Sequence, residues 1–252
     1  MRLKVAVTMP VFNEEAGIIQ FLEELRENLS DYDLSIVIVD DSSTDLTARN
    51  IKDFKRIQPQ VNLTLIENEI NLGHGPSTLK GMAFALTVDA DAVLTVDGDG
   101  QFLGNEMRCA LDTFFSSKAD VLEGVRVKRS EPFFRKISTG AVKILVWSRS
   151  HKVPADGNTP LRIYQSRRLL EIVSGLPSNL LIPNVFISTY SRIQDWNLFE
   201  MKVTSIPSRG NDALGSTWKQ RYAHLPSKRF LKFCLTAFLQ WQKTKIPTER
   251  YK

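Results

Sequence analysis

The chain has 252 residues, of which 42% are hydrophobic and 24% charged, with 33 Lys or Arg against 28 Asp or Glu. This composition excludes a disordered, collagen-like or coiled-coil chain, and the length suits one α/β domain or one domain with a small appendage. The net charge of +5 favours an anionic substrate or partner, but it does not separate nucleic acid, lipid headgroups and phosphorylated metabolites.

The first hundred residues alternate between strand and helix patterns. Residues 3–9 predict a buried strand, and a helix capped by Asn13 follows, with apolar residues at helical spacing. Strands that are nearly continuous in apolar residues imply a mainly parallel sheet with helices on both faces. The same plan repeats with strands at 34–40, 61–67 and 92–101, and with helices at about 44–57 and through 79–86.

The second half is less regular. Arg and Lys recur from Arg126 onward, whereas acids crowd the first hundred positions, so the excess positive charge belongs to the second half. The predicted elements there are a strand near 120–126, helices at about 132–147 and 166–174, a strand at 199–206 and a final helix.

Cysteine usage and hydropathy bear on the compartment. Cys109 and Cys234 each lie in an apolar helical pattern, so neither a disulfide nor a cysteine metal site is indicated, and a cytoplasmic location fits best. We see no secretion signal at the N-terminus. No apolar stretch approaches the roughly 20 residues of a transmembrane helix, so we expect any membrane contact to be peripheral.

The strongest single motif is VDGDGQ, which places Asp97, Asp99 and Gln101 at alternate positions beyond a predicted strand. Spacing of two turns these side chains to one side of an extended segment, where two carboxylates and an amide oxygen suit Mg²⁺ or Mn²⁺. The alternative is a solvated Asp–Gly turn. The glycines between the acids would let a ligand approach the backbone.

A second acidic motif, VDDSSTD, follows the strand at 34–40. We expect Asp41 to contact a ligand and Ser43, Thr44 and Asp45 to cap the next helix. In a parallel sheet, ligands gather at the carboxyl ends of the strands, where both acidic motifs and the PVFNE loop lie.

Several other active-site patterns are missing. The first strand is not followed by a dinucleotide-binding glycine loop, and the chain has no P-loop, nucleophile elbow or zinc pattern. We therefore expect His74, His151 and His224 to be surface or packing residues.

Together, PVFNEE, IVDDSSTD, NLGHG and VDGDGQ resemble, in order and spacing, the family-2 inverting glycosyltransferases of the GT-A fold. The resemblance covers residues 3–101 and implies an α/β GT-A fold, a UDP- or GDP-linked sugar donor and Mg²⁺ or Mn²⁺. The residues that it implies for nucleotide-sugar binding are Pro10, Phe12, Glu14, Asp41, Asp97, Gly98, Asp99 and Gln101, with Asp97, Asp99 and Gln101 at the metal.

The segment GVRVKRSEPFFRKISTGAVKIL is similar to the one that follows the metal motif in dolichyl-phosphate and polyprenyl-phosphate sugar synthases. DGNTPLRIYQ and IPSRGNDALGS resemble later segments of that group, with Leu161, Phe12 and Thr217 departing from its usual residues. The resemblance implies that Arg126, Arg129, Arg135 and Ser138 bind an acceptor phosphate, that Arg209 approaches the donor diphosphate, and that Asp99, Arg126, Arg135 and Arg209 are catalytic.

The chemistry of the acceptor supports the same subfamily. A phosphate is already ionised near neutral pH, so its attack needs cationic positioning instead of a general base, and arginines supply that positioning. One alternative is a solvated basic helix face. Another is a saccharide hydroxyl acceptor with Asp156 as base, and a third is a non-catalytic nucleotide-sugar binder; no signature of a nucleic-acid-binding fold is present.

We predict a glycosyltransferase domain over residues 1–225, with a nucleotide-binding half at about 1–103 and an acceptor half at about 104–225. Residues 226–252 form an amphipathic helix and a basic tail. The aromatic stripe of this helix is typical of core packing or an oligomer contact, and its basic flanks leave a lipid interface as the alternative.

Overall fold

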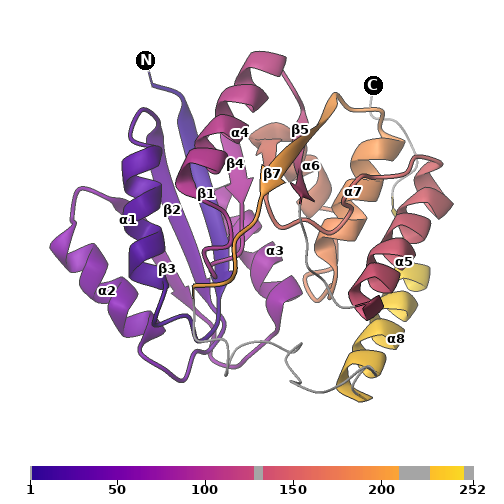
Figure 1. The fold of residues 1–252 in the computed structure, drawn as a ribbon, viewed down its shortest axis with the longest axis horizontal. Coiled ribbons are helices and arrows are strands. Elements are labelled where there is room, and N and C mark those ends of the chain that lie inside the picture. The colour runs from indigo at the N-terminus through magenta and orange to yellow at the C-terminus, as the bar shows by residue number, and fades with distance from the viewer. Residues whose placement is uncertain (1, 128–132, 210–227, 247–252) are drawn as a thin grey trace.

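The computed structural model describes residues 2–127, 133–209 and 228–246 and has one seven-stranded sheet in the order β3-β2-β1-β4-β6-β5-β7 (Figure 1). Only β6 runs antiparallel to its neighbours, so the mainly parallel sheet is confirmed. The strands are β1 (Lys4–Val11), β2 (Asp33–Asp40), β3 (Asn62–Glu67), β4 (Ala92–Thr95), β5 (Val121–Val127), β6 (Arg162–Gln165) and β7 (Leu198–Thr204).

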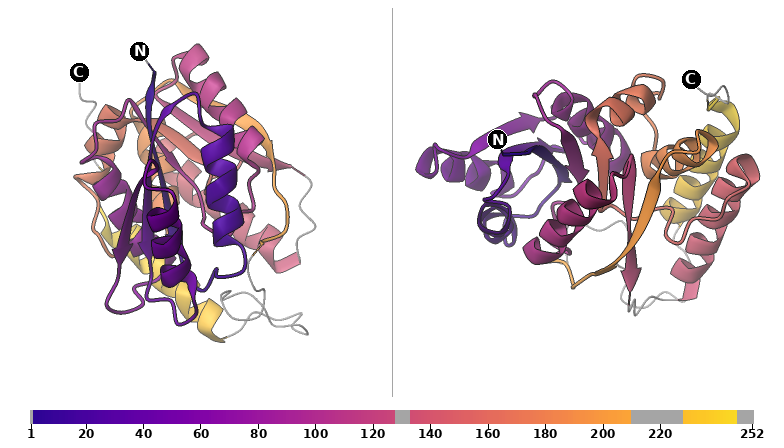
Figure 2. Two further views of the ribbon diagram at one scale, coloured as in Figure 1. Left: turned by 90° about the vertical axis from the view of Figure 1, so that its left-hand side faces the viewer. Right: turned by 90° about the horizontal axis from the view of Figure 1, so that it is seen from above.

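Helices cover both faces of this sheet (Figures 1 and 2). Alternate residues of β1 explain why: Val5 and Val7 pack with Leu111 in one core, whereas Ala6 packs with Met82 in the other. The helices are α1 (Ile18–Asn28), α2 (Thr47–Ile57), α3 (His74–Ala85), α4 (Gly104–Ser117), α5 (Phe133–Ser150), α6 (Ser166–Val173), α7 (Pro183–Ile193) and α8 (Lys228–Lys243).

Two elements were not predicted from the sequence. β6 is only four residues long and contains Arg162, which is fully buried, so it lacks the apolar pattern of a core strand. α7 buries Ser188, Thr189 and Ser191 together with its apolar residues, so its sequence shows little contrast between an apolar and a polar face.

Cys109 lies in α4 and Cys234 in α8, so their predicted helical setting is confirmed, and both are free thiols exposed to solvent. Among the described residues, no helix combines the length and the apolar character that crossing a bilayer requires.

Candidate active site

The loops that follow β1, β2 and β4 lie next to one another at the carboxyl edge of the sheet. Backbone hydrogen bonds continue the pairing beyond the strands: Asp41 N–H donates to Val11 O at 2.9 Å, and Gly98 N–H donates to Pro10 O at 3.2 Å. The predicted convergence of the three loops is therefore present.

The first two loops are joined by side-chain hydrogen bonds. Asn13, with a φ of 56°, accepts from Thr44 N–H at 2.8 Å, and its own N–H donates to Ser43 Oγ at 2.9 Å. The prediction that Asn13 caps α1 is wrong, because this side chain is used to hold the second loop and the helix starts at Ile18 without a side-chain cap. Asp45 does accept from Thr47 N–H, in the first turn of α2.

Asp41 is buried and receives hydrogen bonds from the loop that precedes α3. Its carboxylate accepts from Leu72 N–H and Gly73 N–H, each at 2.8 Å, and from the Asn68 amide and Ser77 hydroxyl, each at 2.9 Å. Two carboxylate oxygens offer about four acceptor sites. Asp41 therefore positions the glycine-containing turn, and its predicted contact with a ligand stays a prediction.

Asp97 and Asp99 lie beyond β4 and are both partly exposed. Burial, followed by the neighbouring Asp97 charge, raises the pKa of the Asp99 carboxyl. A divalent cation between the two carboxylates would relieve this repulsion, and hard cations are commonly held by one or two carboxylates plus substrate phosphates. The pair therefore fits such an ion, although no three His, Cys, Asp or Glu side chains converge on a metal site within the described ranges.

His74 is a site residue that the sequence did not reveal. Its Nε2 lies 2.8 Å from Asp97 Oδ1, so the first residue of α3 contacts the VDGDGQ motif. Partial loss of hydration opposes protonation of the imidazole, but its side chain is still 53% exposed, and the charges of Asp97, Asp99 and Asp41 raise the His74 pKa. The expectation of a mere surface or packing role is therefore incomplete, because this histidine joins two of the loops.

The glycines of VDGDGQ serve packing within the protein. A Cβ on Gly98 would lie 2.3 Å from Val11 Cγ1, so Gly98 allows the loop to lie close against the end of β1. Gly100 has a φ of 67°, and a Cβ there would lie 2.9 Å from Arg209 Cδ. The structure thus gives both glycines a role inside the fold, while the predicted approach of a ligand to them is not tested.

Arg209 lies beside the motif, but its guanidinium points toward α1. Its N–H donates to Asp99 O at 2.9 Å, whereas its Nη1 lies 2.5 Å from Glu24 Oε2 and its guanidinium carbon lies 5.9 Å from the centroid of the Phe21 ring. Gln101 is held in the same way, since its carbonyl accepts from Ile206 N–H. The segment after β7 is therefore docked on the motif, and the predicted contact of Arg209 with a diphosphate stays a prediction.

The predicted acceptor arginines are described only in part. Arg126 Nε and Nη2 donate to the two oxygens of Asp156 at 2.8 and 3.0 Å, forming a bidentate pair at the end of β5. Arg129 lies outside the described residues, and Arg135 and Ser138 lie in the part of α5 whose side chains the structure does not describe.

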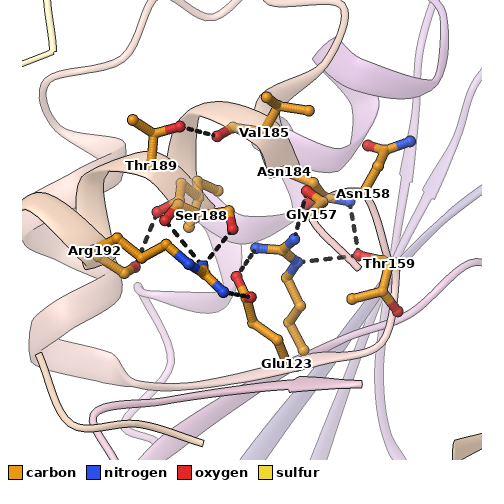
Figure 3. A network of polar contacts seen from close by, with 12 residues as sticks. Glu123, Gly157, Asn158, Thr159, Asn184, Val185, Ser188, Thr189 and Arg192 are labelled. Carbon is orange, nitrogen blue, oxygen red and sulfur yellow. Dashed lines mark hydrogen bonds and ion pairs between the residues drawn. The ribbon is translucent and has the colours of Figure 1, made fainter. Parts of the chain in front are cut away.

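A buried ionic network holds the loop that carries Asp156 (Figure 3). Glu123 accepts from Arg162 Nη1 at 2.7 Å and from Arg192 Nη2 at 2.9 Å. Arg162 also donates to the carbonyl oxygens of Gly157 and Thr159. Burial by itself would raise the pKa of Glu123, but the two guanidinium groups outweigh it and lower that pKa.

This network fixes the backbone of the loop that follows Asp156. It was not predicted, because no periodicity links Glu123 to arginines 39 and 69 residues away.

An open sheet with a carboxylate pair at its carboxyl edge is the architecture of the GT-A glycosyltransferases, and solved structures of that class share this fold. A mannosyltransferase from Pyrobaculum calidifontis, solved with GDP-mannose and Mn²⁺, matches with a TM-score of 0.60 and 18% identity over 98% of this chain and 66% of its own. A glucosyl-3-phosphoglycerate synthase from Mycobacterium tuberculosis, solved with Mn²⁺ and UDP-glucose, gives 0.60 and 13% over 97% of this chain and 80% of its own.

The family model "Glycosyl transferase family 2" matches residues 6–169, and the chain belongs to this family of glycosyltransferases. The chain is 25% identical over 191 residues to an undecaprenyl-phosphate 4-deoxy-4-formamido-L-arabinose transferase of Proteus mirabilis, covering 75% of this chain and 57% of the relative. It is 24% identical over 181 residues to a UDP-N-acetylglucosamine–dolichyl-phosphate N-acetylglucosaminyltransferase of Methanococcus voltae, covering 66% of this chain and 70% of the relative.

Proposed function

We propose that this glycosyltransferase moves a sugar, with inversion and with the help of a divalent metal, from a UDP- or GDP-sugar to a polyprenyl or dolichyl phosphate. The observation that carries the proposal is the crowded pair Asp97 and Asp99, at the point where three strand-end loops meet. The two lipid-phosphate transferases among its relatives support the choice of acceptor, although the alignment covers only 57% of the Proteus transferase.

On the donor side, the nucleoside lies against the first two loops, with Pro10, Phe12, Glu14 and Asp41 as its contacts. Asp97, Asp99 and Gln101 would hold the metal and the diphosphate, with Gly98 close by. When bound, Mg²⁺ or Mn²⁺ neutralises charge on the departing nucleoside diphosphate. Arg209 would reach that diphosphate by exchanging Glu24 for it, since both are anionic partners for one guanidinium.

On the acceptor side, Arg126 binds the phosphate that attacks the anomeric carbon, and Arg129, Arg135 and Ser138 complete the phosphate site. The bonds from Arg126 to Asp156 use Nε and Nη2, so Nη1 is the group that the phosphate would take. Asp156 thereby holds the arginine in one orientation. An ionised phosphate attacks without a general base, so the site needs cations more than it needs a proton acceptor.

A saccharide hydroxyl acceptor is the main rival and would require Asp156 as base. Both oxygens of Asp156 already accept from Arg126, and its side chain is only 7% exposed. It would have to give up this pair to take a proton, so the geometry favours the phosphate acceptor. The remaining alternative, a non-catalytic nucleotide-sugar binder, predicts donor binding without turnover.

The test is to incubate the purified chain with UDP-, GDP- and CMP-linked sugars and polyprenyl phosphate, with and without Mn²⁺ or Mg²⁺. We expect a metal-dependent glycosyl phospholipid from a UDP- or GDP-sugar. The Arg126→Ala/Arg135→Ala double variant should lose transfer to the lipid phosphate, whereas an enzyme that uses a hydroxyl acceptor would stay largely active. Donor binding without transfer to any acceptor would overturn the proposal.

A further inference from the structure

The C-terminal helix α8 has two apolar faces. Ala237 and Trp241 are buried, and the Trp241 ring packs on Phe186 with centroids 5.0 Å apart. On the opposite side, residues at helical spacing leave a second stripe in solvent, and its apolar members are Leu231, Leu235, Phe238 and Leu239, each 42–60% exposed. Packing against the protein therefore accounts for one face only.

The neighbouring helix α5 also exposes apolar side chains and lies beside α8 (Figures 1 and 2). Arg149 of α5 stacks 4.4 Å from the centroid of the Trp241 ring and donates to Thr244 O at 2.9 Å, so the two helices touch at their C-terminal ends. α5 exposes Ile144 and Trp147, at 64% and 50%. Exposed tryptophan and leucine are typical of surfaces that enter the headgroup region of a bilayer.

The charge of these helices is uniformly positive. Neither α5 nor α8 contains an Asp or Glu, whereas together they contain eight Lys or Arg: Arg135, Lys136, Lys143, Arg149, Lys228, Arg229, Lys232 and Lys243. In α8, Lys232 and Lys243 are exposed and lie along one border of the apolar stripe. A cationic border beside an apolar stripe matches an anionic lipid surface.

We propose that the α8 stripe, with the exposed residues of α5, is a docking surface for an anionic lipid bilayer. A second copy of this chain fits less well, because a twofold contact would place two acid-free cationic surfaces face to face. The purpose of such docking, which is to reach a lipid acceptor, rests on the proposed function. α5 lies against the loop that carries Asp156, the partner of Arg126, since a Cβ on Gly157 would lie 3.0 Å from Val142 Cγ1, so docking would bring the phosphate headgroup of a lipid acceptor toward that arginine.

The test compares binding of the full chain to phosphatidylglycerol-containing vesicles and to pure phosphatidylcholine vesicles by co-sedimentation. We expect binding to the anionic vesicles that weakens with salt, and a loss of about tenfold or more in Leu235→Glu/Phe238→Glu. The matched control is Ile57→Glu/Leu170→Glu, which adds the same charge at two exposed apolar positions on α2 and α6 and should bind as the unchanged chain does.

Each outcome decides the inference. Equal binding of both double variants, or no binding of the unchanged chain, would overturn it, as would a dimer that only the α8 variant dissociates in light scattering. Transfer to a water-soluble short-chain prenyl phosphate should be unchanged in Leu235→Glu/Phe238→Glu, while transfer to a long-chain acceptor in vesicles should fall. If no acceptor is glycosylated at all, the proposed function fails, and the vesicle data still judge the surface.

Discussion

The two sides of the carboxyl edge of the sheet differ in how their charged side chains are paired. On the proposed donor side, Asp97 and Asp99 lie close enough to raise the Asp99 pKa; Asp97 contacts the His74 imidazole, but no guanidinium of the described residues is paired with either carboxylate. On the proposed acceptor side, the charges are already matched, since Arg126 pairs with Asp156, Arg162 pairs with Glu123, and Arg192 pairs with both Glu123 and Glu200.

This difference distinguishes charged residues that are available to bind a ligand from charged residues that stabilise the fold. Two like charges held together are costly unless a group of the opposite sign is bound between them, which supports the proposal that a cation and its diphosphate bind on this side. The guanidinium groups of Arg162 and Arg192, paired with Glu123, instead form bonds within the protein, and that of Arg162 also holds the backbone at Gly157 and Thr159. The number of arginines in the second half therefore overstates the positive charge that a substrate meets.

The largest expected effect comes from breaking the donor side. Asp99→Asn should lower transfer by about 10³-fold or more, because one of two carboxylates for the metal and diphosphate is lost while the size of the side chain is kept. Product formation and metal-dependent nucleotide binding measure it, and a circular dichroism spectrum checks the fold. Asp53→Asn, on the exposed face of α2, is the control, and retained turnover in Asp99→Asn would remove this carboxylate from the mechanism.

The second largest effect is expected from Glu123→Gln, which should lower the stability of the fold. Glu123→Gln leaves Arg162 buried without its anion and leaves Arg192 with its second partner, Glu200, and breaking such a buried ion pair costs roughly 3–5 kcal/mol. Thermal unfolding should therefore begin about 6 °C lower or more. Glu27→Gln, whose parent side chain is 65% exposed, should change little. A melting temperature for Glu123→Gln equal to that of the control would show that the network is not a scaffold.

The same carboxylate predicts an acid response. The pKa of Glu123 is lower in the folded chain than its value of about 4.3 in an unfolded chain, so the folded state binds fewer protons. Its contribution to stability is fully present above pH about 4.3 and is lost as the pH falls through the folded pKa. The stability difference between the unchanged chain and Glu123→Gln should therefore shrink below this pH in urea unfolding. A constant difference down to pH about 3 would contradict the assignment.

Sequence periodicity predicted the elements from β1 to β4, because each is long or flanked by clear turns and buries a regular apolar pattern. It also identified the loops that meet at the site, since parallel strands end at one edge. It did not predict the partner of each polar residue. Asn13 bonds to Thr44 instead of capping α1, and Arg209 turns to Glu24, because contacts between residues distant in sequence decide these orientations.

His74 gives the smallest and most informative effect, because it tests whether the donor loops act as one unit. His74→Asn removes the 2.8 Å contact with Asp97, and loss of a group that orients a metal ligand costs about tenfold in metal affinity or activity. Titration of free Mn²⁺ by electron paramagnetic resonance, with nucleoside diphosphate present, should show that loss, and His74→Gln should recover part of it. His151→Asn is the control, since asparagine tolerates the φ of 55° found there. Unchanged Mn²⁺ binding and turnover in His74→Asn would mean that the contact with Asp97 contributes to neither, and that the loops bind the cation independently of α3.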